Sequence, residues 1–306
     1  MMHFAMIGIG AGAAAALLFA SVTSGALLSI PLFYLAPLPI MIAGLGWSHW
    51  AALLAACTGS IGLGLALGTV FLFGFLADAG VPAWWLGYLA MLARPATNGG
   101  GDVLEWYPVG RLVLWAAVIG TLIVAAAVPN FGMDQESLQA ALRKTYERIL
   151  RDQALIDVLV VAVPPAAAIF STITSVFNLW LAARVVKISG RLKRPWPDLA
   201  ALALPPSTSA LLAAAIAGSF LPDLAGVLSG VFAASLLMAF AILGFAVLHA
   251  ITRGMRARIV MLTGLYAAAA VFGWPVLAVA LLGLAESILN IRSRVARKRG
   301  PPSLRT

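Results

Sequence analysis

Charge is the scarcest property of this 306-residue chain. Asp, Glu, Lys and Arg make up 10% of it, and none of them occurs in residues 1–77. An ordinary soluble domain is about a quarter charged and about half apolar, whereas 62% of this chain is hydrophobic. A water-soluble fold cannot bury so much apolar surface. The shortage of charge therefore excludes an ordinary soluble domain and indicates a protein surrounded mainly by lipid.

Cysteine and histidine are nearly absent, with one and three residues respectively. The lone Cys57 excludes an intrachain disulfide, and the three histidines lie too far apart to match a metal-ligand spacing. The chain contains no H-E-x-x-H, G-x-S-x-G or Walker lysine pattern. We therefore predict no catalytic residues, no metal site and no cofactor, and we expect that the protein is not an enzyme.

Long apolar runs are what the sequence does contain. A helix needs roughly 20 apolar residues to cross a ~30 Å hydrocarbon core, and only helices or closed barrels pair every backbone amide there. A barrel would show short alternating segments, whereas these runs are continuously apolar. Beyond residue 77, the runs without Asp, Glu, Lys or Arg are Leu112–Met133, Val158–Ala183, Leu199–Pro222, Leu224–Thr252 and Ile259–Ala285.

These runs predict an all-α fold, a polytopic transmembrane helix bundle with about eight to ten membrane segments. We place the first four segments at about 5–29, 32–47, 50–77 and 82–93. Prolines predict broken helices at Pro31, Pro37 and Pro39 and again at Pro205 and Pro206. Residues 1–292 are expected to form a single transmembrane domain, and residues 293–306 a basic cytoplasmic tail.

Basic residues gather at the ends of the apolar runs. Clusters occur in Arg184–Asp198, in Arg253–Arg258 and from Arg292 onward. Because Lys and Arg concentrate in cytoplasmic loops, an even number of crossings should separate one cluster from the next, and both termini are expected in the cytoplasm. The net charge of +9 then reflects contact with membrane lipid, and we expect no nucleic acid partner.

Residues 134–152 form a segment of a different kind. Leu138, Leu142, Ile149 and Leu150 fall on one helical face, and charged residues of both signs fill the positions between them. This pattern predicts an amphipathic helix that lies on the membrane interface.

Glycines recur four residues apart in two apolar runs, at Gly8 and Gly12 and at Gly64 and Gly68. The sequence around Gly8 resembles a phosphate-binding loop, but it follows no predicted strand. Small residues at this spacing let membrane helices approach closely. We therefore predict helix-packing faces at these glycines.

An interfacial loop is predicted at 94–107, within the least apolar stretch of the first 130 residues. Aromatic rings and charges of both signs favour the headgroup level of a membrane. Two interpretations remain open: a simple water-exposed connection, or a gate or partner-docking loop. The second interpretation depends on Trp84, Trp85, Arg94, Glu105, Trp106 and Arg111.

One set of polar residues lies inside an apolar run. Ser171, Thr174, Ser175 and Asn178 have the spacing of a single helical face. Polar groups in lipid are costly and usually face a bundle interior or a cavity. These four residues are therefore candidates either for interhelical hydrogen bonds or for a face that lines a solute.

A second set lies at the end of the last apolar run. Glu286 and Asn290 are four residues apart, and Arg294 follows one turn later. The three can form a polar ladder at the cytoplasmic rim of the membrane. Alternatively, Glu286 is a carboxylate linked to proton or cation movement, as intramembrane acids often are.

Four segments carry a resemblance to a known family: PLFYLAPLPI (31–40), PAWWLGYLAMLAR (82–94), EWYPVGRLVLW (105–115) and LLGLAESILNIRSR (281–294). Together they resemble the YybS-like family of bacterial membrane proteins. That family is similar in turn to the substrate-binding S components of energy-coupling-factor transporters. Its members often end with a glycine, an acid and an arginine, whose counterparts here are Gly283, Glu286 and Arg292. The resemblance implies a multi-pass protein of the bacterial inner membrane.

Two functions follow from these observations. The first is a solute-binding transport component, with a pocket between broken helices, an unidentified small-molecule substrate and a separate ATPase module as partner. The second is a non-transporting scaffold that organises other membrane proteins of the envelope. The broken helices and the polar face at 171–178 favour the first function.

Overall fold

The computed structural model describes residues 2–96 and 104–299, and helices make up most of them. This helical content confirms the predicted all-α fold. The chain divides into two compact units. The first comprises Met1–Pro108, Ile119–Asn130 and Phe170–Trp196, and the second comprises Val109–Val118, Phe131–Ile169 and Pro197–Thr306. Helices α7 (Val109–Ala127) and α9 (Gln153–Ile188) contribute to both units.

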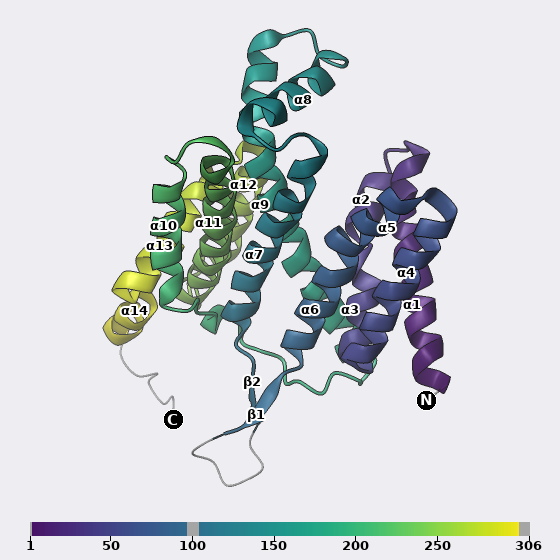
Figure 1. Cartoon of the computed structure of the whole chain (residues 1–306). Helices are drawn as coiled ribbons and strands as arrows, with labels where there is room; N and C mark the ends of the chain where they lie inside the picture. The colour runs from purple at the N-terminus through teal and green to yellow at the C-terminus, as the bar shows by residue number, and fades with distance from the viewer. Residues whose placement is uncertain (1, 97–103, 300–306) are drawn as a thin grey trace. The chain divides into compact units, whose positions relative to one another are not determined.

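The first unit is a group of helices with a two-stranded antiparallel ribbon at one end (Figure 1). The N-terminus of α1 lies at the same end of this unit. Besides parts of α7 and α9, its elements are α1 (Met2–Ala20), the 3-10 turn η1 (Ser21–Ser24), α2 (Ser29–Tyr34), α3 (Pro37–Gly46), α4 (His49–Leu67), α5 (Thr69–Phe75), the π-helical turn η2 (Leu76–Gly80), α6 (Val81–Ala90), β1 (Ala93–Pro95), β2 (Leu104–Trp106) and the 3-10 turn η3 (Val128–Asn130).

Close packing of α1 against α4 is a main contact of the first unit. A Cβ atom added at Gly8 would lie 2.9 Å from Leu54 Cδ2, and one added at Gly12 would collide with Thr58 Oγ1 and the Ala55 carbonyl. A side chain at either position would therefore push the two helices apart. The predicted packing role of Gly8 and Gly12 is confirmed.

Gly68 separates the third span from the fourth. Its φ of +98° is open to glycine but strained for other residues, and it ends α4 immediately before α5 begins. The predicted boundaries of the third and fourth segments are therefore wrong. The third span is His49–Leu67 and the fourth is Thr69–Ala90. Asp78 consequently lies within the fourth span, in the π-helical turn, and not in a connection.

The second unit is organised around its longest helix, α11, which packs against α13. A Cβ atom added at Gly244 would collide with the Val279 carbonyl, and one added at Gly283 with the Phe240 carbonyl. Besides parts of α7 and α9, its elements are α8 (Gln135–Glu147), the 3-10 turn η4 (Leu199–Ala201), α10 (Ser207–Gly218), α11 (Asp223–Ile251), α12 (Arg258–Phe272), α13 (Pro275–Leu289) and α14 (Ile291–Arg299).

The amphipathic helix α8 is shorter than predicted. Asp134 caps its first turn, because its side chain accepts a hydrogen bond from the backbone N–H of Ser137 at 2.8 Å. Leu138 and Leu142 are buried, as an amphipathic helix requires. Ile149 lies beyond the end of α8 and is 77% exposed. Its predicted place on the apolar face is therefore wrong.

Seven segments in the described part of the chain are long and apolar enough to cross a membrane. The bent pair α13–α14 can form an eighth span, and α10 and α12 are shorter apolar helices. Together these segments agree with the predicted multi-pass arrangement. The seven are Phe4–Ser24, Ser29–Gly46, His49–Leu67, Thr69–Ala90, Val109–Asn130, Gln153–Ile188 and Asp223–Ile251.

Polar contacts bring three segments of the second unit together. Arg253 Nη2 lies 3.0 Å from Asp198 Oδ1, and Arg292 Nη1 donates to the Ala200 carbonyl at 2.7 Å. Residues 198–200, the end of α11 and the start of α14 are therefore neighbours. Two helices, α10 and α11, separate the first two segments along the chain. Because α10 is one of the shorter apolar helices, the even number of crossings expected from the charges stays a prediction.

Candidate functional site

The second span is broken between α2 and α3. Pro37 has no backbone N–H and cannot continue a helical ladder. The N–H of Leu38 donates to the Leu35 carbonyl at 3.0 Å and not to the carbonyl of Tyr34, four residues earlier. The Tyr34 carbonyl is thereby left without its usual helical partner inside an apolar span. The predicted break occurs at Pro37, whereas the breaks predicted at Pro31 and Pro39 are wrong, because these residues lie inside α2 and α3.

Asn178 of α9 supplies the missing partner. Its Nδ2 donates to the Tyr34 carbonyl at 2.8 Å and to the Thr174 carbonyl at 2.8 Å. Asn178 is 1% exposed, and its Oδ1 has no hydrogen-bond partner among the described residues. One side chain thus links two spans of the first unit, and its Oδ1 is a buried acceptor without a partner in the described part of the chain.

The predicted polar face of α9 lies partly inside the first unit. Asn178 and Ser175 are buried, whereas Ser171 and Thr174 are half-buried. The Thr174 hydroxyl bonds back to carbonyls of its own helix, as threonines in apolar helices often do. Thr172 is fully buried although it does not belong to the predicted face. The contacts of α9 with its neighbours decide which of its polar side chains are buried. The spacing of polar residues in the sequence does not show this.

Aromatic rings flank the broken span. The ring of Tyr34 lies 5.7 Å from that of Phe170, and the ring of Phe33 lies 4.7 Å from that of Phe19. Phe19 also meets Phe75 edge-on at 5.3 Å. Aromatic pairs at such separations stabilise a structure by about 0.5–1.5 kcal/mol beyond their buried area. The rings therefore help to hold the break in one conformation.

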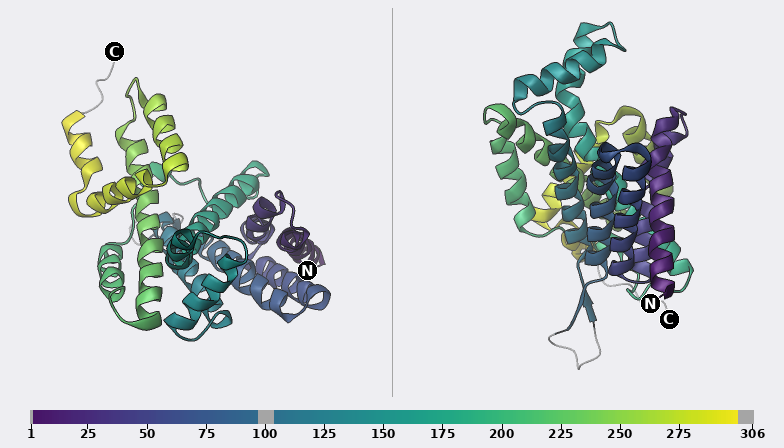
Figure 2. Two further views of the ribbon diagram at one scale, coloured as in Figure 1. Left: turned by 90° about the horizontal axis from the view of Figure 1, so that it is seen from above. Right: turned by 45° about the vertical axis from the view of Figure 1, so that its right-hand side comes forward.

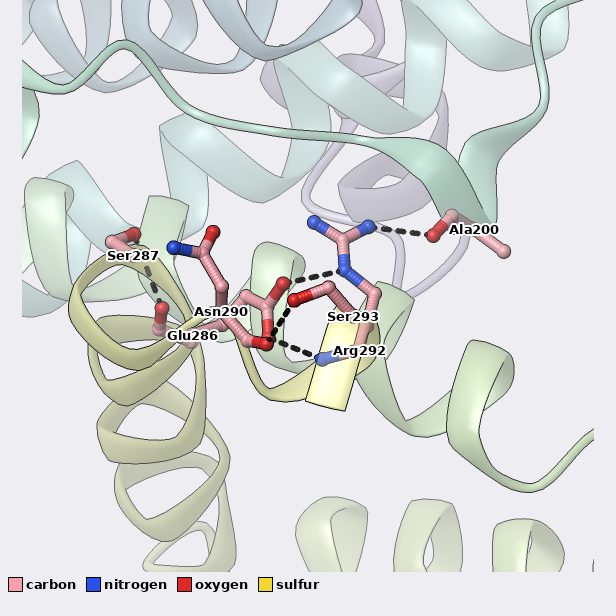
Figure 3. Close-up of polar contacts among 7 residues, drawn as sticks. Ala200, Glu286, Ser287, Asn290, Arg292 and Ser293 are labelled. Carbon is pink, nitrogen blue, oxygen red and sulfur yellow. Dashed lines mark hydrogen bonds and ion pairs between the residues drawn. The ribbon is translucent and has the colours of Figure 1, made fainter. Parts of the chain in front are cut away.

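A second polar site lies at the start of α14 in the second unit (Figure 3). Arg292 Nε donates to Glu286 Oε1 at 2.8 Å, and the backbone N–H of Arg292 donates to Oε2 at 3.0 Å. The side chains are 7% exposed for Glu286 and 20% exposed for Arg292. With the bond from Arg292 to the Ala200 carbonyl, this ion pair joins α13, α14 and η4.

The predicted ladder of Glu286, Asn290 and Arg294 does not form. Asn290 ends α13 in the left-handed conformation, with φ 50° and ψ 55°, and the chain then bends by 72° into α14. The bend interrupts the helical spacing on which the ladder depended and brings Arg292 to Glu286 instead. Glu286 and Arg292 are also the acid and the arginine on which the family resemblance draws.

The interfacial loop begins and ends as a ribbon in which Arg94 of β1 faces Glu105 of β2. Their side chains form an exposed ion pair, with Nε 2.8 Å from Oε2. The hydrogen bond to Glu105 raises the pKa of the Arg94 guanidinium. Trp106 is half-buried at the end of β2. Residues 97–103 of the predicted loop lie outside the described residues.

The remaining gate candidates lie on helices. Trp84 and Trp85 belong to α6, where Tyr88 stacks on Trp84 at 6.3 Å and contacts Trp85 at 5.9 Å. His49 meets Tyr88 at 5.2 Å. Arg111 is an exposed residue of α7 in the second unit. The six candidates therefore come from four elements, α6, β1, β2 and α7. Within the first unit Arg94 pairs with Glu105, and Trp84 lies beside Trp85.

Arg194 has a role that the sequence analysis did not predict. Its Nη1 donates to the Ala90 carbonyl at 2.9 Å and its Nη2 to the Tyr107 carbonyl at 2.8 Å. A cation there donates a hydrogen bond to a free carbonyl at the C-terminal end of α6 and interacts favourably with the negative end of the helix dipole. Burial lowers the pKa of this guanidinium. In the sequence Arg194 is one member of a basic cluster, and nothing but its contacts distinguishes it from Lys193.

Asp78 is a further polar residue that the sequence analysis did not single out. It is half-buried in the π-helical turn of the fourth span. Such turns are frequent at functional sites, and an acid at membrane depth is costly. Across residues 2–96 and 104–299, no group of three His, Cys, Asp or Glu residues could hold a metal ion. The structure therefore gives Asp78 no metal-binding partners.

Comparison with known proteins found no match: no family model, no curated protein and no solved structure is similar to this chain. The resemblance to the YybS-like family and to S components therefore stays a prediction. The two polar sites, at Asn178 and at Glu286, are the candidate functional sites that the structure offers.

Proposed function

We propose that this protein is a solute-binding component of a membrane transport system, and that the solute binds beside Asn178. The observation that carries the proposal is the Asn178 Oδ1 atom, a buried acceptor without a partner in the described part of the chain. It lies on the residue that caps the carbonyl freed by the α2–α3 break. Broken helices with freed backbone groups are typical of solute sites in membrane transporters.

Energetics favour a bound molecule at this position. A buried acceptor without a donor destabilises a fold by about 1–3 kcal/mol. A role restricted to holding two helices together needs the Nδ2 donors of Asn178 and does not need a buried, unpaired Oδ1. A donor group from a solute would pair with this acceptor and remove the penalty. The free energy recovered in this way contributes to binding of the solute.

The chemistry of the first unit indicates the class of solute. No Lys or Arg occurs in residues 1–93, 119–130 or 170–183, so no cation is available there to pair with an anion. The unpartnered group at the site, the Asn178 Oδ1, is a hydrogen-bond acceptor. The site therefore suits a neutral or cationic solute with N–H or O–H donors, next to aromatic rings.

Thermal unfolding of the detergent-purified chain tests the proposal. We expect neutral and cationic donor-bearing metabolites to raise the melting temperature, and anions of the same size to leave it unchanged. Replacing Asn178 with leucine should weaken binding by roughly tenfold, the value of one good hydrogen bond. Asn130→Leu is the matched control, because Asn130 is exposed and bonds to the Ala127 carbonyl at its own helix end.

A broad metabolite panel that produces no shift would remove the basis of the proposal. So would a ligand that binds the Asn178→Leu and Asn130→Leu variants equally well. The chain has no nucleotide-binding loop, so we propose that a separate ATPase module supplies energy. Co-purification of the chain with an ATPase from its own cells, and ligand uptake that depends on ATP, would support this part.

The proposed membrane is the bacterial inner membrane, with both termini in the cytoplasm. Supporting this, Arg194 of the basic segment bonds to the end of α6, so residues 90, 107 and 194 lie at one end of the first unit. In a Cys57→Ser background, we expect an impermeant maleimide to label Ser24→Cys in intact cells and to label Ser189→Cys only after lysis. The opposite labelling would reverse the orientation.

The scaffold function is supported by one observation, the exposed ribbon of β1 and β2. An edge strand presents unpaired backbone groups that another chain can bind. A photo-crosslinking residue in place of Leu104, which is 50% exposed, should give a discrete adduct in cells if this function holds. The same residue at Lys144, on α8, is the control. A purified protein with no ligand and a ribbon-dependent adduct would favour the scaffold over the transport component.

A further inference from the structure

The last two helices meet at a sharp and well-defined turn. Asn290 adopts the left-handed conformation, and α14 leaves α13 at 72°, as the yellow helix in Figure 2 shows. A span of apolar residues crosses a membrane near its normal. If α13 crosses in this way, a 72° bend directs α14 close to the membrane plane.

The Glu286–Arg292 ion pair fixes this bend. Both the side chain and the backbone N–H of Arg292 donate to the Glu286 carboxylate, so the first turn of α14 is attached to the last turn of α13. The bond from Arg292 to the Ala200 carbonyl adds η4 as a third support. In Figure 3 these three contacts converge on the one arginine. The direction of α14 is thus set by buried polar contacts.

The two sides of α14 differ in character. Ile291 and Val295, four residues apart, are half-buried, whereas Arg294 and Arg297 are exposed. The helix contains five Lys and Arg residues and no acid. Arg294 and Arg297 form no ion pair with any residue in the described ranges. The exposed side of α14 therefore carries uncompensated positive charge.

The neighbouring acids do not neutralise this charge. Glu286 is paired with Arg292 and Asp198 is paired with Arg253. Helix α11 also packs against α14, and Arg256, which follows the end of α11, is a further exposed cation of the second unit. A basic helix that directly follows a membrane span is suited to acidic lipid headgroups.

We propose that α14 is an in-plane anchor whose exposed arginines bind the phosphate groups of acidic phospholipids, and that Glu286 is the residue that positions it. Arg294 and Arg297 provide the contacts, and the Glu286–Arg292 pair holds the helix at headgroup level. This inference is independent of the proposed solute site, which lies in the first unit.

Titration of the full detergent-purified chain with dioleoylphosphatidylglycerol tests the lipid contact, with bound lipid counted by native mass spectrometry and dioleoylphosphatidylcholine as reference. A basic residue near an acidic membrane surface strengthens binding roughly fivefold. The Arg294→Gln/Arg297→Gln variant should therefore lose roughly 25-fold in phosphatidylglycerol affinity. Lys144→Gln/Arg148→Gln is the matched control, because Lys144 is an exposed residue of α8 and Arg148 is exposed at its C-terminal cap; it should bind as the wild type does.

A spin label at Ala296 in a phosphatidylglycerol bilayer tests the positioning role. We expect headgroup depth for the unaltered chain and a broader, shallower distribution for Glu286→Gln, with Glu286→Asp restoring part of the original depth. Free glycerol 3-phosphate should not compete with the lipid. The proposal is overturned if the Arg294→Gln/Arg297→Gln variant keeps its phosphatidylglycerol affinity, if free glycerol 3-phosphate displaces the lipid, or if the Ala296 label lies in bulk water.

Discussion

Replacing Arg292 with methionine removes the guanidinium and keeps a side chain of similar length. The Glu286 carboxylate, 7% exposed, then retains the hydrogen bond from the backbone N–H of residue 292 but loses its opposite charge. Breaking a buried ion pair destabilises a protein by about 3–5 kcal/mol, because the remaining charge stays desolvated. The retained N–H and the 20% exposure of the Arg292 side chain reduce the expected loss for R292M to about 2–3 kcal/mol.

The companion variants follow from the same reasoning. Glu286→Leu leaves a guanidinium that can reach water and still bonds to the Ala200 carbonyl, so we expect a loss of about 1–2 kcal/mol. The double variant E286L/R292M leaves neither charge buried and should lie within about 1 kcal/mol of the wild type. The double variant is therefore expected to be more stable than R292M alone, with a coupling free energy of about 3 kcal/mol.

Reversible unfolding in mixed micelles at pH 7, followed by tryptophan fluorescence, gives the free energies of unfolding for this cycle. The exposed pair of Arg94 and Glu105 is the control. Its variants R94M and E105L should each change the free energy of unfolding by less than about 0.5 kcal/mol, as exposed pairs usually do. A double variant E286L/R292M as unstable as the sum of its single variants would refute the argument that these two side chains form a coupled, buried pair.

Three further predictions concern other parts of the structure. Gly12→Ala should destabilise the fold by about 1–3 kcal/mol, because the new Cβ collides with α4, whereas Gly10→Ala, with nothing within 4 Å of its Cβ, should change the free energy of unfolding in detergent by less than about 0.5 kcal/mol; equal effects would contradict the α1–α4 contact. Hydrogen bonds from Ser137 lower the pKa of Asp134 from its ordinary 3.8, so the cap stabilises α8 above that pH and is lost as the pH falls through the lowered pKa; amide exchange in α8, corrected for intrinsic rates, should therefore be faster at pH 2 than at pH 6, and Asp134→Asn should remove the difference. Arg194→Gln should increase amide exchange at residues 91, 92 and 107, because the Ala90 and Tyr107 carbonyls lose their donors, while Lys193→Gln should not; unchanged exchange in both variants would show that Arg194 does not hold the ribbon in place.

Local patterns in the sequence were sufficient for much of the fold. The α1–α4 contact at Gly8 and Gly12 could be expected, because small residues four apart indicate close helix packing wherever the partner lies. The break before Pro37 could be expected as well, because proline removes an N–H in any surroundings. The end of α4 at Gly68 was missed, since a glycine in an apolar run predicts a packing face and a helix end equally well.

The candidate site was only partly predictable for a related reason. Asn178 stood out because a polar residue is rare in an apolar run, yet its partner, the Tyr34 carbonyl, is 144 residues away. No spacing rule connects the two. Helical spacing pairs Glu286 with Arg294 and not with Arg292, because it requires a continuous helix, and the left-handed Asn290 ends that helix. Arg194 could not be told apart from the other residues of its cluster.

Composition alone determined that the chain is a helical membrane protein, because the need to bury apolar surface and to pair backbone amides in lipid acts on every residue wherever it lies in the fold. The tertiary structure decided which polar groups meet: the Asn178 amide with the broken span, Arg292 with Glu286, and Arg194 with the end of α6. These contacts join segments far apart in the chain or depend on a bend in the backbone. Only the packing of helices and the direction of each turn bring such groups within the 2.7–3.2 Å that a hydrogen bond requires.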